Sequence, residues 1–124
     1  MLSPIAYGLA IVLDLTIIFI GVRFFLVPDA AATAFGVPAR SDGDAGTYLT
    51  VKGLRDVTSG VIGLAVLAFA GAHPAGWAML AVSLTPFGDT AIVLRNGGTK
   101  AAAFGIHFAT AVVVVLSGAL LLAA

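Results

Sequence analysis

A cluster of charged residues interrupts the otherwise apolar segment "TYLTVKGLRDVTSGVIGLAV" at residues 47–66. Lys52, Arg55 and Asp56 stand in its first half, and two later apolar segments each carry an ionisable residue in their interior. A carboxylate or imidazole that moves a proton, beside a cation that stabilises developing negative charge, is suited to acid–base chemistry. The candidate catalytic residues are therefore Asp56, Asp89, His107 and Arg55.

A second set of residues is placed to bind a ligand near this cluster. Lys52 and Asp56 are four residues apart, so they share one face of a helix, and Ser59 continues that face. Asp14 lies midway along the first apolar segment, where a carboxylate either hydrogen-bonds a neighbouring helix or carries protons. The candidate ligand-binding residues are Lys52, Asp14, Arg23, Phe104 and Ser59.

The elements that must position these residues are membrane-spanning helices. Apolar residues make up 60% of the 124 residues and charged residues 10%, against about 45–50% and about 25% in soluble domains. Four apolar stretches, at about 4–26, 47–71, 75–95 and 99–123, each approach the ~20 residues that cross a bilayer. Lipid requires every backbone polar group to be paired internally, which favours helices. We therefore predict a single all-α domain over 1–124, a bundle of four transmembrane helices.

Composition also excludes several classes of function. The formal net charge is zero, so there is no basic surface for nucleic acid. The chain has no cysteine, which removes disulfides and thiol chemistry, and no histidine or carboxylate spacing is diagnostic of a metal site. We expect no cofactor. The N-terminal stretch lacks the positive start of a signal peptide and contains Asp14, so we read it as a retained span.

The distribution of basic residues predicts the orientation. The connections on one side carry all the Lys and Arg that flank the spans: Arg23, Arg40, Arg95 and Lys100. The positive-inside rule makes that side cytoplasmic and places both termini outside, in a multi-pass protein of the cell membrane. In the cytoplasmic loop at 27–46, Asp29 as N-cap and Gly36 as C-terminal stop predict a short interfacial helix. On the outer side, "GAHPAG" at 71–76 predicts a turn.

Depth along the helices brings the ionisable residues together. At about 1.5 Å per residue, Asp56, Asp89 and His107 lie about 9 to 12 Å inside the cytoplasmic ends of their helices. Each charge at a helix centre costs about 2.5–3.5 kcal/mol on insertion scales, so these residues need partners or a polar cavity. Asp89 is the expected partner of Arg55, and Pro86 should kink the third span beside it.

Three motifs carry a resemblance to a known family: "FGVP" at 35–38, "VKGLRDVTSGV" at 51–61 and "PFGDTAIV" at 86–93. The chain resembles a family of small four-helix integral membrane proteins that is described as a domain of unknown function and is loosely similar to the DoxX-like group. Gly53, Leu54, Arg55, Asp56 and Gly60 match its most specific element. The resemblance implies a four-helix bundle and brings no assigned activity.

These observations lead to one expected function and two alternatives. We expect a polar pocket in the cytoplasmic half of the bundle that binds a small lipophilic molecule, with acid–base chemistry of the isomerase, cyclase or hydratase type. The first alternative is a homodimeric, proton-coupled transporter of a small solute, with Asp14 as the proton carrier. The second is a non-catalytic accessory membrane subunit whose charges only hold the helices together.

Overall fold

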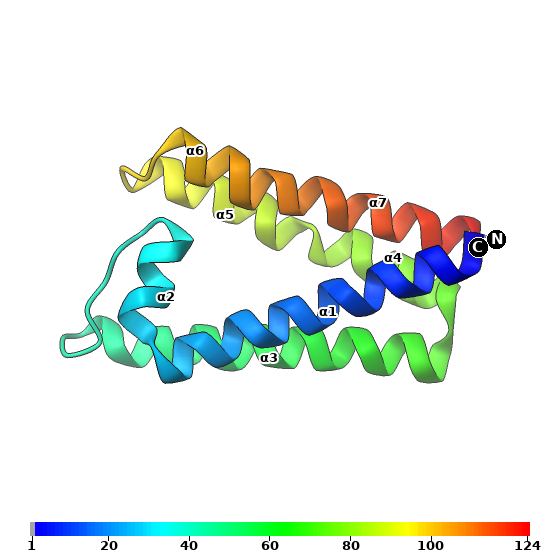
Figure 1. Ribbon diagram of the computed structural model, residues 1–124, viewed down its shortest axis with the longest axis horizontal. Helices are drawn as coiled ribbons and strands as arrows, with labels where there is room; N and C mark the ends of the chain where they lie inside the picture. Colours follow the sequence, from blue (N-terminus) through cyan, green and yellow to red (C-terminus); the bar gives the residue numbers. More distant parts are fainter. Residues whose placement is uncertain (1) are drawn as a thin grey trace.

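The computed structural model describes residues 2–124, and within that range the chain forms helices and no strands. Figure 1 shows the helices packed side by side along one long axis. In chain order the elements are α1 (Leu2–Leu26), α2 (Pro28–Phe35), α3 (Ala45–Ala70), α4 (Ala72–Val82), α5 (Leu84–Arg95), α6 (Lys100–Ala102), the π-helical η1 (Ala103–Phe108) and α7 (Ala109–Ala123).

Four helices are long and apolar enough to span a membrane, as predicted. They are α1, α3, the continuous α4–α5 segment and the continuous α6–η1–α7 segment. Large apolar side chains such as Phe19, Leu26 and Phe69 are exposed on their outer surfaces. Lipid is the solvent that makes such exposure favourable, so the four-helix membrane fold follows from both length and surface.

The predicted turn at 71–76 is wrong in its length. Gly71 alone forms the break, with a φ of 92°, and α4 begins at Ala72. Pro74 therefore lies in the first turn of α4, where a proline is tolerated because the amides there have no helical acceptor.

The bundle consists of two antiparallel helix pairs. In the first pair, α1 and α3 approach so closely that a Cβ on Gly53 would lie 2.8 Å from the carbonyl oxygen of Gly21. In the second pair, α4 meets α7 where a Cβ on Gly76 would lie 3.0 Å from the carbonyl oxygen of Gly118. Small residues let transmembrane backbones touch in this way. The two pairs converge where α1 begins and α7 ends, and they diverge toward α2 (Figure 1).

Two of the spans depart from regular α-helix. The third is interrupted at Ser83, between α4 and α5, close to the kink predicted from Pro86. Pro86 has no amide hydrogen to donate to the preceding turn, whereas Phe87 still donates to the Ser83 carbonyl at 3.2 Å. The fourth span contains the wider π-helical turns of η1, and such turns are frequent at functional sites.

The short helix predicted between the first two spans is present as α2. It starts at Pro28 and ends at Gly36, whose φ of 107° is the left-handed conformation of a helix stop. Its Ala31 and Ala32 pack on Phe24 of α1 in a small apolar core. A larger core, built mostly from small and aliphatic residues, occupies the opposite end of the bundle: Ala6, Ala10, Leu67, Ala75, Met79, Val114 and Leu121.

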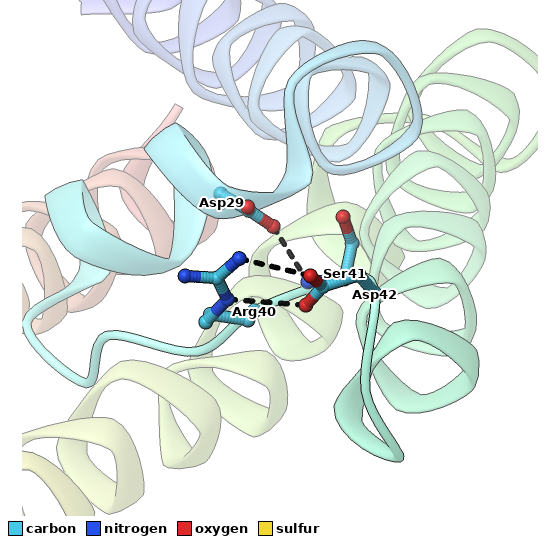
Figure 2. A network of polar contacts seen from close by, with 4 residues as sticks. All are labelled: Asp29, Arg40, Ser41 and Asp42. Atoms are coloured by element: carbon cyan, nitrogen blue, oxygen red, sulfur yellow. Dashed lines mark hydrogen bonds and ion pairs between the residues drawn. The ribbon is translucent and has the colours of Figure 1, made fainter.

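Asp29 does not cap α2, contrary to the prediction. Pro28 takes the first helical position, and the Asp29 carboxylate instead accepts a hydrogen bond from the backbone amide of Ser41 at 2.6 Å (Figure 2). In the same loop Arg40 donates from Nε and Nη2 to Asp42 at 3.1 and 2.9 Å. This exposed pairing lowers the pKa of the Asp42 carboxyl from its ordinary value, chiefly through the hydrogen bond from Arg40. The loop is thus tied to the start of α2.

Candidate functional site

The candidate residues form two groups on different faces of α3 instead of one pocket. The first group faces a cleft between α1, α3 and α4, called here the α1–α3–α4 cleft. The second lies beneath α2 and is called here the α2 cluster, defined by Lys52, Asp56, Asp89 and His107. The two groups separate because Arg55 and Asp56 are consecutive on a helix and so point about 100° apart.

The α1–α3–α4 cleft has a volume of about 660 Å³, which is within the roughly 300–1,000 Å³ usual for small-molecule sites. Its wall is mainly aliphatic, with Ala10, Leu67 and Met79 at the end that joins the larger core. The polar residues that line it are Asp14, Arg55, Thr58 and Ser59. Ser59 was predicted to bind ligand and lies in this wall.

Asp14 is the least satisfied polar residue of the cleft. Its side chain is 7% exposed, and its Oδ2 has no hydrogen-bond partner. The carboxylate rests on Gly63 of α3, where a Cβ would lie 2.6 Å from the Asp14 Cγ. Gly63 therefore makes the space that Asp14 occupies. A buried oxygen without a partner is costly and calls for an occupant that donates a hydrogen bond.

Arg55 does not pair with Asp89, so that prediction is wrong. Within residues 2–124 the structure contains no ion pair of Arg55; its exposed side chain lines the cleft. Along α3, Arg55 stands eight residues before Gly63, which is about 12 Å at the helical rise. The cleft thus has a cation toward its α2 end and a carboxylate further in, separated by apolar wall.

Lys52 is the cation that pairs with the buried carboxylate of Asp56 in the α2 cluster. Its Nζ lies 2.9 Å from Oδ2 of Asp56, one turn along the same helix. The same Nζ stands 4.8 Å from the ring centre of Phe24 and 4.7 Å from that of Phe35. Aromatic faces attract cations, so the ammonium is held by one carboxylate and two aromatic rings.

His107 ties the fourth span to α2. Its Nε2 lies 2.6 Å from the carbonyl oxygen of Phe35, and the two rings are 4.3 Å apart. Ala103 and His107 are both buried in η1, whose wide turn aligns residues four apart on the inner face. Because His107 contacts Phe35, the last residue of α2, this contact has a structural role: it holds the end of α2 against the fourth span.

Asp89 lies near the α2 cluster, close enough to interact electrostatically with Lys52, His107 and Asp56. It is half-buried and makes no ion pair within 4 Å among residues 2–124. The cluster is therefore one lysine–carboxylate pair, with a second carboxylate and an imidazole near it. Such a group fixes the positions of the helices that carry it.

The remaining two candidates lie elsewhere. Arg23 is half-buried and lines a separate, smaller cavity of about 270 Å³ between α1, α2 and η1. Phe104 is 48% exposed, stacks edge-on against Phe108 at 6.0 Å and is not among the residues that line either cavity, so its role in ligand binding stays a prediction. The π-helical turns rotate Phe104 away from the buried His107, with which a regular helix would have aligned it.

Sequence reasoning missed two residues that shape these sites, Phe24 and Phe35. A lysine about two turns inside an apolar helix was the available signal that aromatic faces had to be near. The close approach of Gly63 to the Asp14 carboxylate could be known only from the packing of α1 on α3.

Comparisons with known proteins agree with this architecture at the level of the family. A family model described as a domain of unknown function, DUF4267, matches residues 15–121. The match includes the α2 cluster and the cleft residues of α3 and α4, whereas Asp14 lies one residue before its start. No curated protein and no solved structure matches the chain.

Proposed function

We propose that this chain, which belongs to the DUF4267 family of unknown function, binds a small and largely apolar molecule in the α1–α3–α4 cleft. The observation that carries the proposal is the buried Oδ2 of Asp14, which has no hydrogen-bond partner among residues 2–124 and belongs to a residue that lines this cleft. A ligand hydroxyl, amide or amine would supply the missing hydrogen bond. An acceptor or negative group about 12 Å away would meet Arg55.

The source of the ligand is the lipid phase. Leu54 and Ile62, both more than half exposed, stand at the edge of the cleft on the outer surface of α3. A molecule that partitions into the bilayer can therefore enter sideways between α3 and α4. The concentration of basic residues at the α2 end supports a cytoplasmic position for that end, in the cell membrane.

The chemistry available to such a ligand is acid–base chemistry. Asp14 would exchange a proton with the bound molecule, and Arg55 would stabilise negative charge that develops at its other end. This assignment replaces Asp56 and His107 as the first candidates, because both already have close partners in the α2 cluster. Isomerisation, cyclisation or hydration of a lipophilic substrate are the reactions that this pair suits.

Native mass spectrometry of gently extracted protein tests the binding proposal. Wild-type protein should retain a small molecule, and Asp14→Leu should lose it while remaining folded, since the substitution removes an unpartnered buried carboxylate. Asp89→Asn is the matched control, because this carboxylate does not line the cleft. An empty wild-type protein, or equal loss from both variants, would count against the proposal.

Proton-coupled transport is a second candidate, favoured by the same isolated Asp14. A transporter that cycles one proton needs a lone carboxylate and does not need Arg55. Counterflow in vesicles should then be abolished by Asp14→Asn and survive Arg55→Ala. Dependence on both residues would favour the binding and acid–base proposal instead.

A further inference from the structure

The cavity that contains Arg23 is distinct from the α1–α3–α4 cleft and shares no lining residue with it. It measures about 270 Å³ and lies between α1, α2 and η1. Phe24 and Phe35 form its aromatic wall, and the buried ring of His107 closes another side. The volume fits a polar head group with a few carbons and is too small for a whole lipid.

Arg23 gives this cavity its charge. Among residues 2–124 it is the only side chain with a permanent charge that lines the cavity, and no carboxylate of that range lines it. Arg23 makes no ion pair within this range, whereas Lys52 is paired with Asp56. A half-buried guanidinium beside apolar walls is stabilised by an anion that accepts its fork of hydrogen bonds.

The margin of the cavity points to lipid as the source of that anion. Ile20 of α1 and Ile106 of η1 both line the cavity, and they are 37% and 47% exposed on the outer surface of the bundle. An acyl chain attached to a head group at Arg23 would leave between these two side chains. A soluble anion would have no use for this apolar exit.

We propose that the cavity binds the anionic head group, a carboxylate or phosphate, of a membrane amphiphile, with Arg23 as the charge partner. This site is independent of the proposed function of the α1–α3–α4 cleft. Its occupant would pack on the rings of Phe24 and Phe35, which also contact Lys52. Binding would therefore hold α2 against the rest of the bundle.

The test is native mass spectrometry of the full chain in neutral detergent, titrated with dioleoylphosphatidylglycerol. Arg23→Gln should weaken binding at least about tenfold, because hydrogen bonds between two ionised groups are among the strongest. Arg95→Gln is the matched control, since Arg95 ends α5, is exposed and does not line the cavity. Equal weakening by both variants would reduce the effect to general surface charge and overturn the proposal.

Two further experiments distinguish binding in the cavity from attraction by the charge alone, and binding of a lipid from binding of a free anion. Ala34→Phe, which fills the cavity and leaves Arg23 in place, should also abolish binding. Inorganic phosphate at millimolar concentration should not displace the lipid, and dioleoylphosphatidylcholine, which has no net charge, should bind more weakly. Displacement by phosphate would assign the site to a soluble anion, and unchanged binding in Ala34→Phe would place the lipid outside the cavity; either result refutes the proposal.

Discussion

Replacement of Lys52 by methionine should destabilise the bundle far more than the loss of one surface charge. The side chain of Asp56 is 11% exposed and that of Lys52 is 29% exposed, so the pair is largely buried. Removing one partner of a buried pair costs about 3–5 kcal/mol, because the other charge is left uncompensated. The partial exposure of Lys52 places the expected cost at the lower limit, about 3 kcal/mol.

The aromatic contacts change this figure only slightly. Two cation–π contacts contribute about 0.5–1 kcal/mol each at partly exposed sites. Methionine keeps sulfur contacts with Phe24 and Phe35, worth about 0.3–1.5 kcal/mol each, which offsets most of that loss. The double variant Lys52→Met with Asp56→Leu removes both charges, and we expect its stability to lie within about 1 kcal/mol of wild type.

The assay is reversible unfolding by sodium dodecyl sulfate in mixed micelles, followed by circular dichroism. Lys100→Met, at the exposed start of α6, serves as the control and should change the free energy of unfolding by less than about 0.5 kcal/mol. The reasoning would be refuted if Lys52→Met cost less than about 1 kcal/mol, or if the double variant were as unstable as the sum of its single variants.

Two other predictions follow from the packing and the loop. Gly60→Ala would place a Cβ 2.5 Å from the backbone oxygen of Asp14, so it should cost about 1–3 kcal/mol in the same unfolding assay. For Gly63→Ala the three atoms nearest to the new Cβ belong to the Asp14 carboxylate, the end of a side chain. This variant should leave stability near wild type and release the small molecule from the cleft, and equal destabilisation by both variants would contradict this. The Asp42 carboxyl has a pKa below its ordinary value because Arg40 donates to it. Its stabilisation is present above the unfolded-state pKa and lost as pH falls through the folded-state pKa, so an NMR titration of Asp42 should show a midpoint that rises in Arg40→Gln.

The spans were predictable because long apolar runs leave few alternatives to a transmembrane helix. The ends of the spans were less predictable. At Gly71 a single residue with a positive φ connects two helices where the sequence predicted a turn of six residues. The predicted pairing of Arg55 with Asp89 was wrong for a different reason. Depth within the bilayer says how far along a helix a charge lies, whereas its partner depends on how the helix is rotated against its neighbours.

Contacts between distant parts of the chain could not be predicted either, because they also depend on how the helices pack against one another. Phe35 and His107 are 72 residues apart and meet only because η1 widens the fourth span at that point. An apolar sequence carries no period that distinguishes a π-helical turn from an α-helical one. The motifs that carry the family resemblance include Phe35 and Asp89, but the contact of Phe35 with His107 was visible only in the assembled bundle.

The pairing of Lys52 with Asp56 inside one helix bears on how the chain enters a membrane during synthesis. The Lys52–Asp56 pair can pass into lipid without a partner from a later helix, which leaves Arg55 as the charge of α3 that is unpaired within residues 2–124. Asp14 has no ion pair within α1 among residues 2–124, and the surface that receives its carboxylate is Gly63 of α3. The next long helix to leave the ribosome, α3, is thus the helix that buries the carboxylate of Asp14. The helices α1 and α3 can therefore assemble as an insertion intermediate before α4 is made.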